Sequence, residues 1–374
     1  KRFANKIPAL YFFVRKCHLS LTIEHNYQFK KLLSVDFIIK VLYNYTDKLF
    51  LEECVMYPLK LKPAFKDYLW GGTKLRDVYG KDCDFDKVAE SWELSCHKDG
   101  NSVIDNGEAK GMTLADYIEK EGKQILGRNC ERFENFPVLI KLIDAKDNLS
   151  VQVHPDNEYA MRVEGEYGKT EMWYIVDCDE GAELIYGFKR NVTKEEFAER
   201  IRNNTLLEIT NSVPVKKGDV FFIRSGTLHA IGKGILIAEI QQNSNTTYRV
   251  YDYGRVGADG KTRPLHIEKA LDVTNLCPAE PYPATEAVTE NGCTKKLLSK
   301  CEYFTVYKID IENSAEFNAD ETSFESILVL EGDVTLKSAD GDITLKKGET
   351  AFLPAGLGKY TIEGKSQAIL TRID

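Results

Sequence analysis

The stretch from Leu149 to Trp173 carries polar side chains whose types and spacing could bind a metal ion. Gln152 and His154 lie two residues apart in a run typical of a strand, so both side chains project from the same face. Glu171 opens a second strand-like run, and His229 follows far downstream in SGTLHA. Two imidazoles, one carboxylate and one amide oxygen suit a borderline metal such as zinc. The spacing alone leaves a structural His-Pro turn open as the alternative.

Length and composition narrow the class of protein. The chain has 374 residues, enough for a large core and for two or more modules. It is 43% hydrophobic and 29% charged, and its formal net charge of −8 argues against a general nucleic-acid binder. It contains no apolar run of roughly 18 residues, so we predict no membrane span. The nine scattered cysteines form no C-x-x-C pair, which favours reduced thiols in a cytoplasmic protein.

Residues 1–55 differ in composition from the rest of the chain. They are rich in Lys, Phe, Tyr, Leu, Ile and Asn, and they carry nine Lys/Arg against five Asp/Glu. The first methionine is Met56. The segment does not fit a targeting peptide, because its apolar run is short and no small-residue cleavage site follows. We therefore predict that residues 1–55 are an N-terminal extension, non-native or peripheral, and that Met56 is the natural start.

Short strand-like runs separated by glycine-rich turns dominate the chain after Met56. A near-continuous apolar run at 136–145 precedes the candidate metal stretch, and strand patterns continue to residue 242 with turns at KKGD, SGT and GKG. Helical patterns occur at 113–126 and after Thr193, where Thr193 and Glu196 fit a capping box. This organisation indicates a mainly β protein, an antiparallel sandwich or barrel with short helical insertions.

An internal repeat divides the chain into two similar parts. Lys346 to Glu349 match Lys216 to Asp219 at an offset of 130, and the segments that follow also align. In this register His229 corresponds to Lys359, whose ammonium cannot join a metal shell while it is charged. The sequence therefore predicts two jelly-roll units. Residues 56–275 would bind the metal, and residues 276–374 would be a metal-free copy.

Several long motifs make the chain recognisable from Met56 to its end. It resembles the type I mannose-6-phosphate isomerases (phosphomannose isomerases), particularly the short bacterial form. The resemblance rests on YLWGGTKLRDVYG, LSVQVHPDNEYA, GKTEMWYIVD, AELIYGF, RSGTLHA and EIQQNSNTTYRVYDYGR. It implies cupin-like jelly rolls, one zinc ion per chain, and interconversion of mannose 6-phosphate and fructose 6-phosphate through a cis-enediol. A monomer is the default expectation, with a sugar phosphate as the small-molecule partner.

The resemblance also assigns roles to individual residues. The zinc ligands of the family fall on Gln152, His154, Glu171 and His229. The catalytic arginine matches Arg249, an active-site lysine matches Lys169, and a serine near the sugar phosphate matches Ser150. Lys169 and Arg249 are expected to bind substrate as well. Glu239 matches an acidic residue considered for proton transfer, and we predict it to be the base, ahead of a metal-bound hydroxide or Lys169. A structural ion pair with Arg249 is the alternative for Glu239.

The chain departs from the family pattern at one position near the arginine. Many members have Asp four residues before it, whereas this chain has Asn245. If that acid carries a proton in relatives, this protein must use water or another group. Trp70, Trp92 and His97 could line a sugar site, or they could be core aromatics and a surface histidine. His266 is expected to be structural.

Two other functions fit part of the pattern. Two histidines and one carboxylate also suit a non-haem Fe(II) oxygenase, although the additional Gln ligand counts against it. A sugar-sensing regulator that keeps the fold without catalysis is the non-enzymatic alternative. The intact set of metal ligands, together with Lys169 and Arg249, counts against that second alternative.

Overall fold

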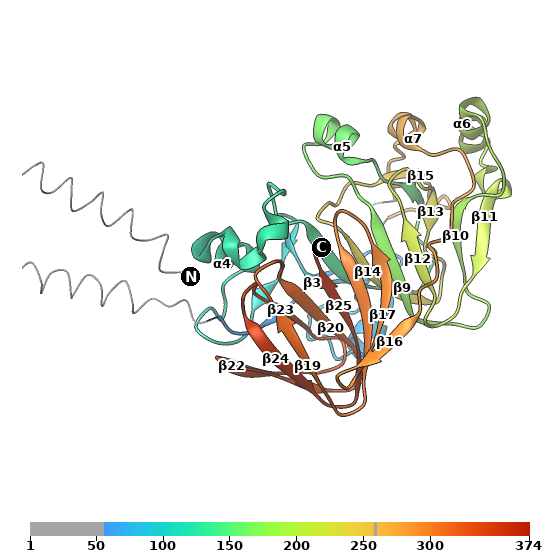
Figure 1. The fold of residues 1–374 in the computed structure, drawn as a ribbon. Coiled ribbons are helices and arrows are strands. Elements are labelled where there is room, and N and C mark those ends of the chain that lie inside the picture. Colours follow the sequence, from blue (N-terminus) through green and yellow to red (C-terminus); the bar gives the residue numbers. More distant parts are fainter. Residues whose placement is uncertain (1–55, 258–259) are drawn as a thin grey trace, which may run out of the picture. The chain divides into compact units, whose positions relative to one another are not determined.

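The computed structural model describes residues 56–257 and 260–374, so the prediction made for residues 1–55 lies outside the described residues. The described chain consists mainly of antiparallel β-sheets, with short helices along their margins (Figure 1). The predicted mainly β fold is thus confirmed. No helix in these ranges is long and apolar enough to cross a membrane.

The first β unit is built from two sheets that face one another across a core. Its six-stranded sheet has the order β12 (Val220–Ile223), β9 (Glu171–Cys178), β14 (Ile235–Gln242), β7 (Val138–Ala145), β3 (Glu90–Leu94) and β2 (Ala64–Lys66). Its five-stranded sheet has the order β11 (Thr210–Pro214), β10 (Glu183–Phe188), β13 (His229–Ala230), β8 (Val151–Val153) and β15 (Tyr248–Tyr251). Trp173, Ile237 and Tyr186 belong to the apolar cluster between them.

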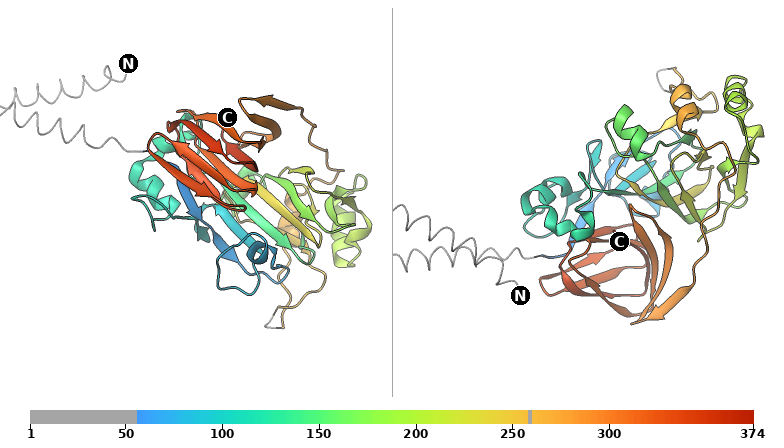
Figure 2. Two further views of the ribbon diagram at one scale, coloured as in Figure 1. Left: turned by 90° about the horizontal axis from the view of Figure 1, so that it is seen from below. Right: turned by 45° about the horizontal axis from the view of Figure 1, so that its top comes forward.

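The second β unit repeats this arrangement. Its eight-stranded sheet has the order β16 (Ala287–Glu290), β17 (Cys293–Lys300), β18 (Thr305–Ile311), β25 (Ser366–Arg372), β20 (Glu325–Glu331), β23 (Thr350–Leu353), β1 (Leu59–Lys62) and β6 (Val103–Ile104). Its four-stranded sheet has the order β19 (Ser314–Ala319), β24 (Gly358–Glu363), β21 (Val334–Ser338) and β22 (Gly341–Leu345). Figure 2 shows these orange and red strands curving around their own interior, beside the strands of the first unit.

The two units share a large core. Side chains of β7 and β14, such as Ile140 and Ile240, belong to the same apolar cluster as Phe304 and Phe352 of the second unit. The six-stranded sheet is therefore covered on both faces. This explains why every residue of β7 is buried and why its sequence is almost continuously apolar. It also explains why every residue of β3 is buried.

The earliest strands of the chain do not stay with the first unit. β1 pairs with β23 on one side and with β6 on the other, so both strands extend a sheet made mainly of C-terminal residues. The predicted domain boundary near residue 275 stays a prediction. β1 and β6 come before it in the sequence, yet they belong to the sheet formed mainly by residues that come after it.

The internal repeat is visible in backbone hydrogen bonds. The Gly218 amide donates to the carbonyl of Ile175 at 2.8 Å, and the Gly348 amide donates to that of Val329 at 2.7 Å. Both glycines have positive φ, +93° and +84°, a conformation that favours glycine. In each turn the amide of the first lysine donates to the side chain of the acid three residues later, at 2.9 and 2.7 Å. The two KKG-acid turns are therefore structural copies.

The helical segments are shorter than their sequence patterns. The pattern at 113–126 forms α4 (Leu114–Glu121), and Gly122 with φ of +88° separates it from the 3-10 turn η2 (Lys123–Leu126). At the start of α6 (Lys194–Arg202) the Thr193 hydroxyl accepts a hydrogen bond from the Glu196 amide at 3.1 Å, as predicted. The other half of the predicted capping box does not form, because the Glu196 carboxylate binds Arg190. The other short elements are α3 (Lys74–Asp77), η3 (Arg128–Cys130), α5 (Asn157–Val163), η4 (Leu206–Glu208), α7 (Ile267–Val273) and the hairpin β4 (Cys96–His97) with β5 (Gly100–Asn101).

Candidate metal centre and active site

Both sheets of the first unit contribute to the predicted metal site. In the five-stranded sheet, Gln152 of β8 and His229 of β13 are direct cross-strand partners. His154 follows the end of β8, so it shares a side with Gln152, as the strand period predicts. Glu171 is the first residue of β9 in the six-stranded sheet. Residues up to 77 positions apart in the sequence are thereby brought to one place between the sheets.

The ligand atoms of these residues converge. One atom from each of His154, Glu171 and His229 lies within 4.8 Å of the others, and all three side chains are buried. Nε2 of His154 is 3.2 Å from Oε1 of Glu171, and Nε2 of His229 is 3.8 Å from its Oε2. The side-chain amide nitrogen of Gln152 is 3.4 Å from Nε2 of His229. A flip of this side-chain amide would exchange its nitrogen and oxygen and so place the oxygen at that position.

Hydrogen bonds to the backbone orient both imidazoles. Nδ1 of His154 lies 2.9 Å from the carbonyl oxygen of Thr246, and Nδ1 of His229 lies 2.8 Å from that of Thr227. Because a carbonyl only accepts, each Nδ1 carries the proton and each Nε2 turns a lone pair toward Glu171.

The protonation states of the two histidines also favour metal binding. Burial, with the Lys169 charge adding to it, lowers the pKa of His154 to about 3, and burial likewise lowers the pKa of His229. Two neutral imidazoles and a carboxylate form a donor set that fits a divalent transition metal.

Lys169 lies against the same cluster. Its buried ammonium contacts Oε1 of Glu171, lies 3.2 Å from Nε2 of His154, and is 4.0 Å from Oε1 of Glu239. Burial raises the pKa of Glu171, but Lys169 and His154 outweigh burial, so the net pKa lies well below the usual range. Lys169 thus places a positive charge between two buried carboxylates.

Glu239 occupies the centre of a row that crosses the six-stranded sheet. Its cross-strand neighbours are Lys141 in β7 and Trp173 in β9. The Trp173 indole donates to Oε2 of Glu239 at 2.8 Å and to Oε2 of Glu171 at 3.1 Å, which links the row to the cluster. Burial, with the Glu171 charge adding to it, raises the pKa of Glu239. A proton acceptor is therefore held beside the candidate metal centre.

The ion pair of Glu239 differs from the alternative considered in the sequence. Lys141, not Arg249, faces Glu239, at 3.3 Å between Nζ and Oε1. Lys141 also lies 3.6 Å from Glu90, and these carboxylates raise its pKa despite complete burial. Lys141 is not among the residues predicted for the site. Its signal was the single cation inside the apolar run FPVLIKLIDA, because a lysine is rarely buried without a partner.

Arg249 and Ser150 lie on the Gln152 side of the centre. Arg249 in β15 is the cross-strand partner of Gln152, and its Nε donates to the Ser150 hydroxyl at 3.2 Å. That hydroxyl donates to Oε1 of Gln152 at 3.4 Å. Burial, and then the Arg263 charge, lower the pKa of Arg249, which still stays protonated because a guanidinium is so strongly basic. The structure therefore brings together all eight residues that the sequence selected.

The remaining candidates lie in neighbouring interactions. The Asn245 side chain donates to Asp99 at 2.9 Å. His97 is only 5% exposed and its ring lies edge-on to Trp92 at 5.7 Å, so of the two alternatives left open for it, the surface histidine is wrong. The strand β3, which carries Trp92, is buried throughout, whereas the adjoining hairpin of β4 and β5 is mostly half-buried, with His97 as its buried residue. Trp70 belongs to the core between the sheets.

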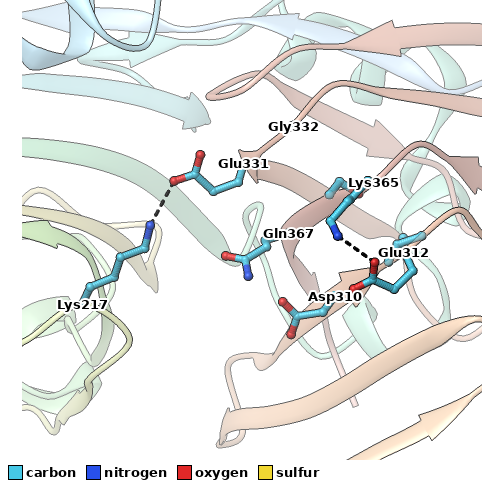
Figure 3. A pocket seen from close by; sticks show the side chains of 9 residues that line it. Lys217, Asp310, Glu312, Glu331, Gly332, Lys365 and Gln367 are labelled. Carbon is cyan, nitrogen blue, oxygen red and sulfur yellow. Dashed lines mark hydrogen bonds and ion pairs between the residues drawn. The ribbon is translucent and has the colours of Figure 1, made fainter.

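A separate hollow lies where the two units meet. It has a volume of about 450 Å³ and is lined mainly by charged residues of the second unit. Figure 3 shows Lys217 facing Glu331 and Lys365 facing Glu312, at 3.0 and 2.8 Å. None of the clustered residues lines this hollow. The chemistry of the side chains, rather than the size of a hollow, identifies the candidate site.

Comparisons with known proteins agree with this geometry. Residues 58–188 match the model of the phosphomannose isomerase type I catalytic domain, and residues 294–373 match that of the mannose-6-phosphate isomerase cupin domain. Mannose-6-phosphate isomerase ManA of Bacillus subtilis is 42% identical over 319 residues, which cover 84% of this chain and 99% of that protein. A mannose-6-phosphate isomerase of Streptococcus mutans is 40% identical and covers 83% of this chain and 97% of that protein. The crystal structure of the Bacillus subtilis mannose 6-phosphate isomerase matches with a TM-score of 0.80 at 40% identity, over 84% of this chain and 99% of that one.

The fold is thus a pair of cupin-type β units, one of which holds a buried cluster of side chains that could bind a metal ion. The chain belongs to the type I phosphomannose isomerase family, and it is an isomerase. The family assignment favours this activity over the oxygenase and over the non-enzymatic regulator.

Proposed function

We propose that the protein is a zinc-dependent aldose–ketose isomerase that interconverts mannose 6-phosphate and fructose 6-phosphate through a cis-enediol. The observation that carries the proposal is the buried convergence of His154, Glu171 and His229 within 4.8 Å, in a chain whose relatives are named mannose-6-phosphate isomerases. The metal-binding unit would span residues 56–275, with residues 276–374 as its metal-free copy.

Gln152, His154, Glu171 and His229 would hold the zinc ion. When bound, the ion supplies a Lewis acid that stabilises negative charge on the sugar oxygens. Because Gln152 is neutral, Glu171 is the single anionic side chain among the four. The Nδ1 bonds of both histidines support their role as ligands, since they fix each ring with Nε2 free to coordinate.

Glu239 would move the proton in this reaction. It removes the proton from C2 of the aldose and returns it to C1. A second proton passes from the C2 hydroxyl to the C1 carbonyl oxygen, so that C2 becomes the ketone and C1 carries the hydroxyl. Two features support this role. Burial raises the pKa of the Glu239 carboxyl, and the Trp173 indole binds Oε2, so that Oε1 faces Lys169 at 4.0 Å on the side of the candidate centre. The ammonium of Lys141, 3.3 Å from Oε1, favours the carboxylate form and so opposes the effect of burial.

Arg249, Lys169 and Ser150 would bind and orient the sugar phosphate. A guanidinium stays charged at any relevant pH and can donate in a planar fork to the developing enediolate. Lys169 is aligned with Glu171 and Glu239, where an ammonium can bind a substrate oxyanion. Ser150 lies between Arg249 and Gln152, and we place the phosphate on this side of the site.

A coupled isomerase assay with metal analysis tests the proposal. We expect turnover of mannose 6-phosphate to disappear when a chelator strips the protein and to return with zinc. Full turnover by protein shown to be metal-free would refute zinc dependence.

A matched pair of variants tests the ligand set. His229→Ala should lose zinc and activity together, because Zn–ligand bonds are few and each is required. Lys359→Ala is the control, since Lys359 is the exposed counterpart of His229 in the second unit. Retention of zinc and activity by His229→Ala would remove this histidine from the ligand set.

A further inference from the structure

The strand that carries Arg249 lies at the edge of its sheet. β15 bonds to β8 on one side and is the last strand of the five-stranded order. In an antiparallel strand the N–H and C=O of one residue point to the same side, so an edge residue needs a partner for both groups. α7 lies beside β15 (Figure 1), and His266 immediately before α7 supplies that partner. Its backbone N–H donates to the Arg249 carbonyl at 2.8 Å, and its Nδ1 accepts the Arg249 amide at 3.2 Å.

The same segment also holds the guanidinium. Nη1 of Arg249 donates to the carbonyl of Pro264 at 3.0 Å, and Nε donates to Ser150 at 3.2 Å. His266 occupies the N-cap position of α7, yet its side chain makes no capping bond to that helix. The imidazole is therefore engaged by the strand and not by its own helix.

We propose that His266 is a positioning residue for Arg249, which it holds in the site through an unprotonated Nδ1, and that protonation of His266 releases this hold. The proposal rests on the proposed function, because it gives Arg249 a role in sugar phosphate isomerisation. Protonated Nδ1 would present an N–H to the N–H of Arg249, and two donors cannot bond. The Arg249 amide would then lose its acceptor, which leaves the strand edge held by the His266 backbone N–H alone, and the guanidinium would lose its alignment with Ser150.

The charged surroundings of His266 keep the imidazole neutral. Arg249 of β15 and Lys269 of α7 are cations, and Glu164 after α5 is the one anion that acts on it. Glu164 is itself bonded to Lys269 at 2.6 Å and to the Tyr248 hydroxyl at 2.8 Å. Burial first, and then Arg249 and Lys269, lower the pKa of His266 below its usual range. At neutral pH the imidazole is therefore an acceptor, and it becomes a donor only as the pH falls through this lowered pKa.

Three variants distinguish a positioning role of His266 from a purely structural role. His266→Leu keeps the approximate size and removes the acceptor. His266→Asn restores an acceptor, because its Oδ1 is as many bonds from the backbone as Nδ1, and that acceptor does not titrate. Glu268→Gln changes an exposed residue in the first turn of the same helix and is the control.

We expect His266→Leu to lower kcat by ~10-fold at neutral pH, since misplacing a binding group costs alignment in the transition state. His266→Asn should recover most of this loss, and its kcat should fall less than that of the wild-type protein between about pH 7 and pH 5. Zinc content and melting temperature, measured for every variant, exclude loss of the centre or of the fold as the cause.

Equal kcat in His266→Leu and wild type, equal damage in the Asn and Leu variants, or an unchanged acid-side profile in His266→Asn would each overturn the proposal. An NMR titration gives a readout that does not depend on isomerase activity. The Arg249 amide resonance should move with the titration of His266 in the wild-type protein and stay fixed in His266→Asn. If the wild-type protein lacked isomerase activity, the proposed function would fail. The NMR titration would still show whether the protonation of His266 changes its hydrogen bond to the Arg249 amide.

Discussion

The two histidines of the candidate centre owe their orientation to backbone carbonyls that sequence spacing cannot locate. The partner of His154 is the carbonyl of Thr246, 92 positions away. The motifs predict which residues would bind the metal, and the structure places two imidazoles and one carboxylate of that set within 4.8 Å of one another, while metal binding itself stays a prediction. Lys141 and His266 were missed as participants, because their contacts arise from strand pairings and from a helix approach that leave no local pattern.

Glu239→Gln tests the proposed base at the scale of one atom. The amide keeps the size of the side chain and can still accept from Trp173, but it cannot take a proton. We expect kcat to fall by at least ~100-fold with zinc still bound. Because the pKa of Glu239 is raised, the acid-side fall in kcat/KM of the wild-type protein should lie above the ordinary glutamate value of about 4.3. Near-normal turnover in the variant, with zinc content verified, would exclude Glu239 as the base.

Asn245→Asp tests the position at which the chain departs from its relatives. The new carboxylate would lie about where the Asn245 amide now donates to Asp99, at 2.9 Å, and like charges raise the pKa of at least one member of the pair. A carboxyl whose pKa is raised on folding costs no stability at a pH below its unfolded pKa of about 3.9. The cost grows as the pH rises from the unfolded pKa to the raised folded pKa, and it is fully present above the folded pKa. We expect a loss of about 0.5–1 kcal/mol at neutral pH, limited because the Asp99 side chain is 44% exposed.

Denaturant unfolding at acid and neutral pH measures this loss. The double variant Asn245→Asp with Asp99→Asn is the control and should recover the stability. A loss of equal size at both pH values would show that charge repulsion is not its cause.

Strands proved easier to predict than their pairing. The runs at 136–145 and 213–242 form strands as expected, and the capping threonine of α6 lies where the pattern indicates. The row of Trp92, Lys141, Glu239 and Trp173 across four strands could not be predicted, because a period of two assigns a face but not a neighbour. The helix pattern at 113–126 was overextended, since Gly122 with positive φ ends α4.

Thr193→Ala tests one local prediction at the scale of an element. The Thr193 hydroxyl satisfies the Glu196 amide at the start of α6, and removing such a cap costs about 1 kcal/mol. Thr205→Ala is a matched control, because Thr205 occupies the N-cap position of η4 without a side-chain capping bond. Thermal unfolding should show a lower midpoint for Thr193→Ala alone. Equal shifts in the two variants would contradict the assignment of the cap.

At the scale of the molecule, the repeat predicts two units but not how closely they depend on one another. β1 and β6 lie in the sheet of the second unit, and the six-stranded sheet buries its outer face against Phe304 and Phe352. No sequence pattern indicates this exchange, because strands as short as β6 carry almost no pattern. The first unit, which contains the candidate metal centre, is thus closed on one face by residues that do not belong to its own repeat.

A truncation after residue 275 tests this dependence. The fragment 56–275 would expose the β7 and β14 side chains that now contact the second unit, and each large apolar side chain returned to water costs about 1.5–3 kcal/mol. It would also leave β1 without β23. We expect the fragment alone to aggregate or to unfold without a cooperative transition, and we expect co-expression with residues 276–374 to restore a zinc-binding complex. A fragment that unfolds cooperatively and binds zinc by itself would show that the shared core is dispensable, and that the first unit is a domain in its own right.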